Sequence, residues 1–386
     1  MTTATNDRRD RTLILVFGAI ALLILPFILQ SAGNFWVRIA DFALLYVLLA
    51  LGLNIVVGYA GLLDLGFVAF FAIGAYMYAL MASPHLSQTF AWFAAMFPDG
   101  LHTSVWLVIP LGAAIAGIFG ILLGAPTLKL RGDYLAIVTL GFGEIIRVFL
   151  NNLDHPVNLT NGPKGLGQID GITLFKFEAL GIKGINLSRR MEIGDFTISS
   201  VTLYYYLFLV LVVASLILCH RLELSRIGRA WMAIREDEIA AKAMGINTRN
   251  MKLLAFGMGA TFGGVSGAMF SAFQGFVSPE SFSLMESVMI VAMVVLGGIG
   301  HLPGVILGAV LLSALPEVLR WVSGTLDLQS VTGGRLDPAI LRQLLIALAM
   351  IIIMLWRPRG LWPSPEHGKS LRQNGRPAAA PAAAAE

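Results

Sequence analysis

Residues that could carry out catalysis are few in this chain and lie far apart. Its six histidines are scattered, and HExxH, GxSxG and paired-carboxylate patterns are absent from the sequence. A single cysteine, Cys219, excludes an internal disulfide and a cysteine-based metal site. The sequence also lacks GxxxxGK[ST], so no ATP-binding P-loop is predicted. We therefore expect no enzyme, no metal and no cofactor here; if ATP drives the protein, another subunit must bind it.

The clearest ionisable residues within strongly apolar stretches are Asp64, in GYAGLLDLGF, and Glu144, in LGFGEIIRVF. Ionisable groups are costly in hydrocarbon and often mark a solute pathway. Glycines surround Asp64, so a helix could break there and offer free backbone groups to a zwitterionic solute. For Glu144 the alternative is a self-satisfied pair with Arg147 at i, i+3. The predicted pathway residues are Gly58, Gly61, Asp64, Gly66, Thr139 and Glu144.

Small residues recur every four positions in two of the apolar stretches. One ridge is Gly112, Ala116, Gly120 and Gly124, and the other is Ala255, Gly259, Gly263, Gly267 and Ser271. Small residues at this spacing let helices approach closely in lipid. The ridges predict either plain helix packing or surfaces along which helices slide during transport.

Composition indicates the class of protein that must hold these residues. The chain is 57% hydrophobic and 13% charged, whereas about 25% of residues are charged in a soluble protein. The net charge of +4 fits anionic lipid better than nucleic acid, because the basic residues lie between apolar spans. We predict an all-α, polytopic transmembrane bundle of about ten helices. The predicted spans are 13–30, 39–58, 62–81, 104–128, 134–150, 201–220, 253–273, 287–299, 305–322 and 340–356.

The distribution of Lys and Arg predicts the topology. Most of the 27 basic residues fall in residues 1–12, 129–132 and 221–252 and after Trp356, which places these segments and both termini in the cytoplasm. The first span is interpreted as a retained helix, with a cleaved signal peptide as the alternative. The predicted parts are a cytoplasmic N-terminus (1–12), a transmembrane permease domain (13–356) with a periplasmic loop (151–200) and a cytoplasmic loop (221–252), and a largely disordered cytoplasmic tail (357–386).

The cytoplasmic loop 221–252 has the sequence of a helix. Ser225 is a suitable N-cap, good helix formers follow without a proline, and Gly245 is a natural stop. Small residues near its end, including Ala240 and Ala241, leave little bulk on one flank, so this helix could enter a groove on a partner. We interpret the loop as the element that transmits force from a soluble motor to a membrane pathway.

Several stretches resemble LivM-type permeases of bacterial branched-chain amino acid ABC transporters. They are GYAGLLDLGFVAFFAIGAYMYALM, KLRGDYLAIVTLGFGEIIRVF, TNGPKGL, GRAWMAIREDEIAAKAMGIN and MVVLGGIGHLPGVILGA. The resemblance implies an inner-membrane importer of leucine, isoleucine and valine that works by alternating access. It implies as partners a LivH-like sister permease, two cytoplasmic ATP-binding subunits and a periplasmic amino-acid-binding protein. The implied ATPase-coupling residues are Gly228, Arg229, Arg235, Glu236, Ala240, Ala241 and Gly245.

Two alternatives stay open at this point. Urea and short-chain amide permeases share these motifs, so the substrate could differ while the mechanism is the same. A stand-alone secondary transporter would need an internal repeat and ion-binding carboxylates. No clear second copy of the GYAG or KLRGDY stretch is present.

Overall fold

The computed structural model describes residues 2–98, 100–103, 105–127, 130, 132–174, 185–188, 190–193 and 196–325, together with 344, 347–348, 351–352, 355–357 and 360–362. Long apolar helices dominate this part of the chain. They are α1 (Thr2–Ala32), α2 (Asn34–Asn54), α3 (Val68–Ala82), α6 (Val105–Thr127), α7 (Asp133–Asn152), α8 (Ser200–Leu224), α11 (Thr248–Gln274), α12 (Leu284–Gly297) and α13 (Leu302–Thr325). The predicted polytopic helical bundle is confirmed.

Five helical segments among the described residues are long and apolar enough to cross a membrane: Asn34–Tyr59, Val105–Thr127, Ser200–Leu224, Thr248–Gln274 and Leu302–Trp321. Shorter apolar helices accompany them at Phe17–Ala32, Val68–Ala82 and Leu284–Gly297. Every predicted span before residue 340 overlaps a helix in the described ranges. The last predicted span, 340–356, and the tail lie largely outside them.

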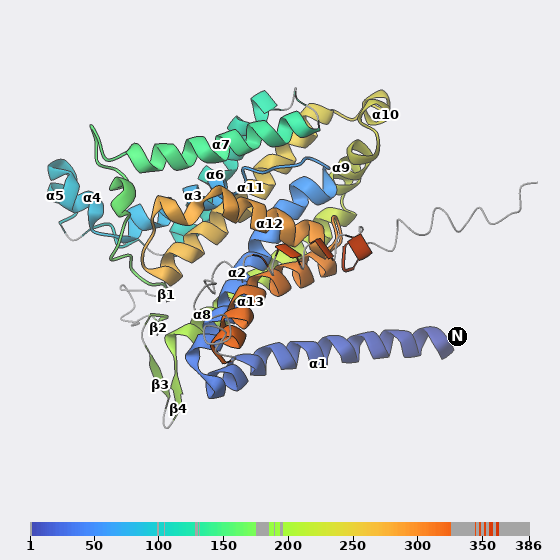
Figure 1. Cartoon of the computed structure of the whole chain (residues 1–386), viewed down its shortest axis with the longest axis horizontal. Helices are drawn as coiled ribbons and strands as arrows, with labels where there is room; N and C mark the ends of the chain where they lie inside the picture. Colours follow the sequence, from blue (N-terminus) through green and yellow to red (C-terminus); the bar gives the residue numbers. More distant parts are fainter. Residues whose placement is uncertain are drawn as a thin grey trace, which may run out of the picture.

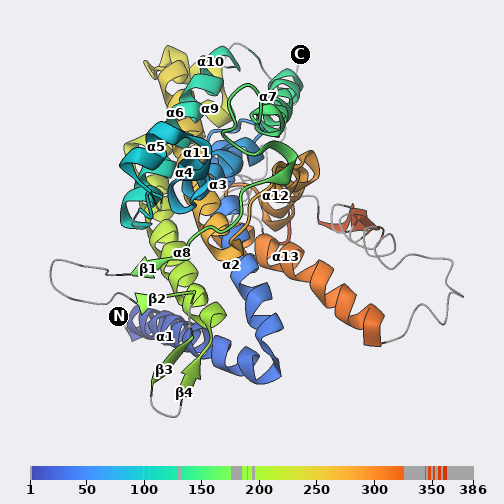
Figure 2. The same cartoon turned by 90° about the vertical axis from the view of Figure 1, so that its left-hand side faces the viewer.

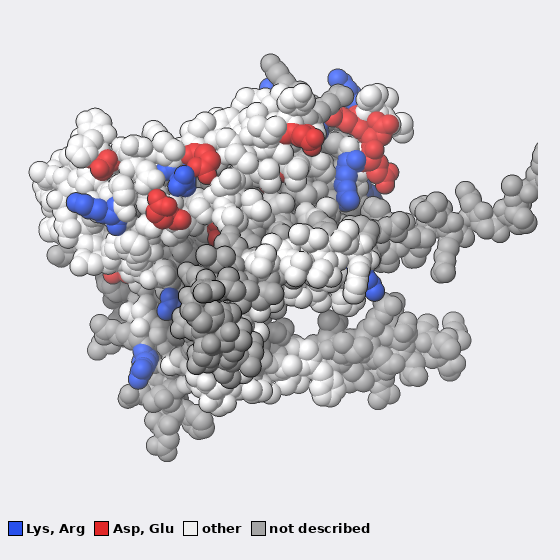
Figure 3. All heavy atoms as spheres, viewed as in Figure 1, with Lys and Arg blue, Asp and Glu red and all other residues white. Residues whose placement is uncertain are grey.

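The bundle has two distinct ends (Figure 1). The short helices α9 (Arg226–Glu236) and α10 (Glu238–Ala243) lie at the same end as the N-terminus of α1. The opposite end carries α4 (His85–Thr89), α5 (Ala91–Met96) and the small strands. On the face seen in Figure 3, charged side chains gather toward these two ends, and a largely uncharged band separates them. A band of this kind suits the hydrocarbon layer of a bilayer.

Helix α11 lies at the centre of the bundle and packs against α2, α3 and α6 (Figure 2). Glycines allow the close approach: a Cβ added to Gly264 would lie 2.6 Å from the Cβ of Ala116, and one added to Gly263 would lie 2.9 Å from the Cβ of Phe70. Both predicted small-residue ridges therefore pack against neighbouring helices, which is the packing interpretation. The α6 ridge lies against Phe256, Ala260 and Gly264 of α11, whereas the α11 ridge lies against α2 and α3.

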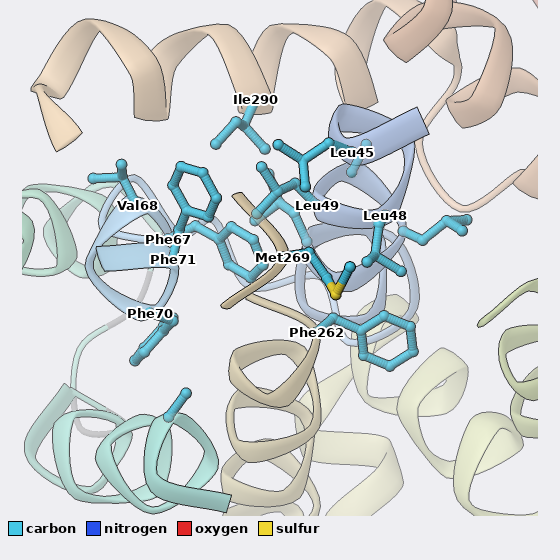
Figure 4. Close-up of a cluster of buried hydrophobic side chains, with 14 of the residues drawn as sticks. Leu45, Leu48, Leu49, Phe67, Val68, Phe70, Phe71, Phe262, Met269 and Ile290 are labelled. Atoms are coloured by element: carbon cyan, nitrogen blue, oxygen red, sulfur yellow. The ribbon is translucent and has the colours of Figure 1, made fainter. Parts of the chain in front are cut away.

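Aromatic and aliphatic side chains complete the core beside α11 (Figure 4). Leu45, Leu48 and Leu49 from α2 belong to one buried cluster with Phe70 and Phe71 from α3. Residues from α11 and α12 enter the same cluster, and the two rings of Phe71 and Phe270 lie 5.3 Å apart. This core holds α2, α3, α11 and α12 together at the level of the broken segment described below.

The segment from 153 to 199 adds short elements to the helical bundle. They are the 3-10 turn η2 (Gly162–Lys164) and two antiparallel strand pairs, β1 (Thr173–Leu174) with β2 (Ile185–Asn186) and β3 (Met191–Ile193) with β4 (Phe196–Ile198). Backbone hydrogen bonds tie the segment to the bundle: the Asp170 N–H donates to the Ala82 carbonyl (2.8 Å), and Leu166 pairs with Val277. The 3-10 turn η4 (Pro279–Phe282) lies beside η2.

Two sequence predictions need correction. The helix predicted from Leu62 begins at Val68, because the chain between them is non-helical. The single helix predicted from Ser225 to Gly245 is two helices, because Asp237 adopts an extended conformation and ends α9. An Asp at such a position competes for backbone N–H groups and so favours a new helix start over continuation of the old one.

Candidate functional site

The two short helices α9 and α10, called here the α9–α10 pair, begin at side-chain caps. Ser225 Oγ accepts a hydrogen bond from the Gly228 N–H (3.1 Å), as its sequence position predicts. Asp237 Oδ1 accepts from the N–H groups of Ile239 (2.8 Å) and Ala240 (3.0 Å). Gly245 follows α10 with a φ of +85°, which confirms it as the stop.

The α9–α10 pair is attached to the start of α11 by two buried contacts. Trp231 is fully buried, and its Nε1–H donates to the Met251 carbonyl at 2.7 Å. Lys252, which is 6% exposed, places its Nζ 2.8 Å from Glu238 Oε1. Because an indole N–H and a buried ammonium both need partners, these contacts fix the pair on the central helix.

Arg235 reaches from the last turn of α9 to the end of α2. Its Nη1 donates to the Gly58 carbonyl at 2.5 Å. Its path passes closely over two glycines: a Cβ on Gly61 would lie 2.8 Å from the Arg235 Cγ, and one on Gly300 would lie 2.8 Å from its Nη1. Gly61 also has a φ of +69°, a conformation that favours glycine. The structure thus joins a predicted coupling residue to two predicted pathway residues.

Gly58 and Gly61 belong to a break between α2 and α3, called here the broken segment (55–67). It starts with a π-helical turn, η1 (Ile55–Tyr59), and continues without helix from Ala60 to Phe67. Its backbone is satisfied by side chains from other helices: Thr139 Oγ1 accepts from the Leu65 N–H (3.0 Å), and Ser287 Oγ donates to the Leu65 carbonyl (2.5 Å). Non-helical backbone within a membrane bundle persists where protein groups satisfy it in this way.

Asp64 lies inside the broken segment, which confirms the predicted break around it. It does not cap α3: that helix has Phe67 at its N-cap without a side-chain bond, while Asp64 Oδ1 accepts from the Gly66 N–H at 2.9 Å. The cavity beside Asp64, Gly66 and Thr139 holds only about 10 Å³, which is at most the space for one water. In this conformation the predicted pathway residues around Asp64 are packed shut.

Glu144 stands apart from the broken segment. It pairs with Arg147 on the same helix, with Arg147 Nη2 2.9 Å from Glu144 Oε2. Arg147 in turn lies 3.8 Å from Glu280. This arrangement is the self-satisfied i, i+3 pair that the sequence offered as the alternative.

The remaining coupling residues divide into inward and outward sets. Gly228 and Ala241 are buried within the α9–α10 pair, whereas Arg229, Glu236, Ala240 and Gly245 are exposed. Sequence reasoning missed two apolar residues of this region: Ile239 is 71% exposed and Met244 is 84% exposed. The available signal was their position in the sequence: Ile239 directly precedes Ala240, and Met244 directly follows Ala243, and both alanines face outward. These two exposed apolar side chains, on α10 and directly after it, are candidates for a contact surface.

A cavity of about 250 Å³ with a mixed polar and apolar lining lies between the α9–α10 pair and the start of α7. Arg235, Glu238 and Lys252 line one side of it, and Asp133 lines the other. Arg235 therefore borders this space as well as the broken segment.

Comparison with the sequences of known proteins shows the family of this chain. Residues 35–355 match the sequence model of the family described as the branched-chain amino acid transport system permease component. The chain is 41% identical over 360 residues to the high-affinity branched-chain amino acid transport system permease protein LivM of Escherichia coli K12, covering 89% of this chain and 74% of the relative.

More distant relatives cover most of both chains as well. The probable LivM permease of Methanocaldococcus jannaschii is 24% identical over 344 residues, covering 83% of this chain and 90% of its own length. LivH of Escherichia coli K12 is 25% identical over 325 residues, covering 83% of this chain and 92% of its own length. No solved structure matches significantly. With the match to the family covering most of its length, this chain is a multi-pass membrane protein that belongs to the branched-chain amino acid transport system permease family.

Proposed function

We propose that this chain is the LivM-type permease subunit of an ATP-driven importer for leucine, isoleucine and valine. The 41% identity to LivM over 89% of the chain supports the substrate class. The similarity to LivH supports a sister permease as its membrane partner. Two separate ATP-binding subunits and an external amino-acid-binding protein complete the proposed assembly in a bacterial inner membrane. Both termini then lie in the cytoplasm, on the side of the α9–α10 pair.

One observation carries the mechanism: Arg235 connects the α9–α10 pair to the broken segment through the Gly58 carbonyl. The exposed side chains of Ile239, Ala240 and Met244 are the proposed contact for a groove on the ATP-binding subunit. When ATP binding moves that groove, α9 moves with it and pulls on Gly58. ATP can shift the permease only by binding one of its two conformations better, so this contact must differ between them.

Transport of the proposed substrate is tested in cells that lack this gene and in the same cells with the gene restored. We expect labelled leucine uptake to return with the gene, to require ATP and to be displaced by isoleucine. Uptake of urea with no change in leucine uptake would make the chain a urea or short-chain amide permease and would refute the substrate assignment. Uptake that persists after ATP depletion would refute the ATP-driven mechanism.

The contact with the ATP-binding subunit is tested by Met244→Asp. A charge in the centre of an apolar contact costs several kcal/mol when it is desolvated, so we expect the ATP-binding subunits to be lost from the purified complex. Met96→Asp is the matched control, because Met96 is 67% exposed on α5 at the other end of the bundle. Retention of the ATP-binding subunits by Met244→Asp would refute the assignment of the contact.

A further inference from the structure

A second cavity lies between α2, α12 and α13, away from the α9–α10 pair. Its volume is about 430 Å³, within the range of about 300–1,000 Å³ for small-molecule sites. Four charged residues line it: Arg38, Glu286, and the i, i+3 pair of Glu317 with Arg320, in which Arg320 Nη1 lies 2.9 Å from Glu317 Oε2. Charged groups of both signs in one cavity between apolar helices are expensive, and they commonly mark a solute site.

Arg38 and Glu286 are held in place before any ligand arrives. Arg38 Nη2 donates to Gln274 Oε1 at 2.8 Å, and its guanidinium lies 5.8 Å from the centre of the Phe42 ring. Glu286 Oε1 accepts from the Tyr46 hydroxyl at 2.5 Å. A guanidinium has five N–H donors and a carboxylate about four acceptor sites. Both groups therefore have capacity for a further partner after these contacts.

The rest of the cavity wall is apolar. Phe42, Met289, Met293 and Leu312 contribute aromatic, thioether and aliphatic surface. Unbranched methionine side chains adapt to apolar groups of different shape. A ligand with one negative group, one positive group and a short aliphatic side chain matches the cavity in all three respects.

We propose that this cavity binds an aliphatic amino acid as a zwitterion, with its carboxylate on Arg38 and its ammonium on Glu286. The inference rests on the proposed function, because it takes the solute of that function and assigns it a place in this chain. The aliphatic side chain of the ligand lies against Met293 and Leu312. Neutral urea has neither charged group and leaves both ion pairs unmade.

The cavity is connected to the α9–α10 pair by α2. Arg38 stands in the second turn of α2, whereas Gly58, the acceptor for Arg235, lies in η1 directly after that helix. At about 1.5 Å per residue the two positions are roughly 30 Å apart along the axis. The turn between α12 and α13 is attached to the same end, because the Gly300 N–H donates to Asn54 Oδ1 at 2.9 Å. A movement at Gly58 therefore reaches the helices that form the cavity.

Ligand protection of a cysteine tests the site in vesicles that contain the complete transporter. Ser313 lines the cavity, and Cys219, the only native cysteine, is fully buried. In Ser313→Cys we expect leucine to slow modification by a charged methanethiosulfonate at least threefold. At the same concentration, leucinamide, which lacks the carboxylate, and 4-methylpentanoate, which lacks the ammonium, should not protect. Ser31→Cys is the matched control, since Ser31 also bonds a carbonyl three residues earlier but lies on α1.

A substitution tests the ammonium contact separately. Loss of one charged hydrogen bond predicts a rise of roughly tenfold or more in the leucine concentration at half-maximal uptake for Glu286→Gln. Glu280→Gln removes an acid that is 70% exposed outside the cavity, and should change that concentration less than twofold. Both variants are compared at equal amounts in the membrane.

The outcomes separate this inference from the proposed function. If the vesicles take up leucine but leucine does not protect Ser313→Cys, the proposed function stands and the site is wrong. Equal protection by leucinamide or 4-methylpentanoate would also overturn it, because the site would then bind apolar matter such as a lipid chain. If the native transporter takes up no leucine, the proposed function itself fails.

Discussion

Replacing Arg235 by Gln tests whether the α9–α10 pair acts on the bundle through this one side chain. The substitution removes the bond from Nη1 to the Gly58 carbonyl (2.5 Å). It leaves Trp231 and Lys252 in place, so the pair stays attached to α11. We expect ATP hydrolysis to continue while leucine uptake falls.

The size of the effect follows from the bond that is lost. A hydrogen bond from a charged donor contributes about 1.5–3 kcal/mol, and each 1.4 kcal/mol corresponds to about a factor of ten. If the whole of this energy couples the two elements, the ratio of uptake to ATP hydrolysis should fall roughly 10- to 150-fold. Gly61→Ala should act in the same direction without removing Arg235, because its Cβ would lie 2.8 Å from the Arg235 Cγ.

Uptake and ATP hydrolysis are measured together in proteoliposomes that contain the full transporter. Arg221→Gln is the control, since it removes one positive charge from an exposed residue at the same end of the bundle. Its ratio of uptake to hydrolysis should stay within twofold of the native value. An unchanged ratio in Arg235→Gln, at an equal amount in the membrane, would refute this route of coupling.

Three further substitutions test the capping of α10 and the contacts of α11. Asp237→Ala removes the cap of α10 and should cost about 1 kcal/mol locally, seen as roughly fivefold faster amide exchange in α10 with unchanged exchange in α11. Gly267→Ala forces α11 against the backbone of α3 and should destabilise the protein by about 1–3 kcal/mol, whereas Gly141→Ala, which meets nothing within 4 Å, should leave the melting temperature unchanged. Lys252→Met removes the ion pair with the partly exposed Glu238 and should lower the free energy of unfolding by about 1–2 kcal/mol. The control Lys242→Met, at an exposed residue, should leave the melting temperature unchanged. Equal melting temperatures for the two variants would contradict this expectation.

The helices could be predicted from the sequence because lipid imposes a simple rule on long apolar runs. Their locations up to residue 325 follow from length and hydropathy. The Ser225 cap and the Gly245 stop also follow, because each depends on a single residue type with a local backbone requirement. The clustered glycines predicted a break near Asp64, but they did not predict how many residues the break spans.

The partners of these residues could not be predicted, because they come from distant parts of the chain. The backbone of Leu65 forms hydrogen bonds with the side chains of Thr139 and Ser287. Nothing in the local sequence of 60–67 indicates which helices supply these side chains. Arg235 was placed in the coupling region by resemblance alone, without its contact to Gly58. The cavity at Arg38 was missed because its charged residues lie on three helices, and because Arg38 and Glu286 fall one residue before the spans predicted at 39–58 and 287–299.

The closed state around Asp64 sets a minimum for what ATP must supply in the proposed cycle. Opening a path there requires the Leu65 N–H to leave Thr139, the Leu65 carbonyl to leave Ser287 and the Gly66 N–H to leave Asp64. The two neutral hydrogen bonds at Leu65 are worth about 0.5–1.5 kcal/mol net each, and the bond to the Asp64 carboxylate about 1.5–3 kcal/mol. Unless water replaces them, the three together oppose opening by roughly 2.5–6 kcal/mol. A shift of about 5.5 kcal/mol takes a two-state equilibrium from 1:99 to 99:1. In the proposed cycle the broken segment would therefore stay shut without ATP and would open when nucleotide binding acts on it through Gly58.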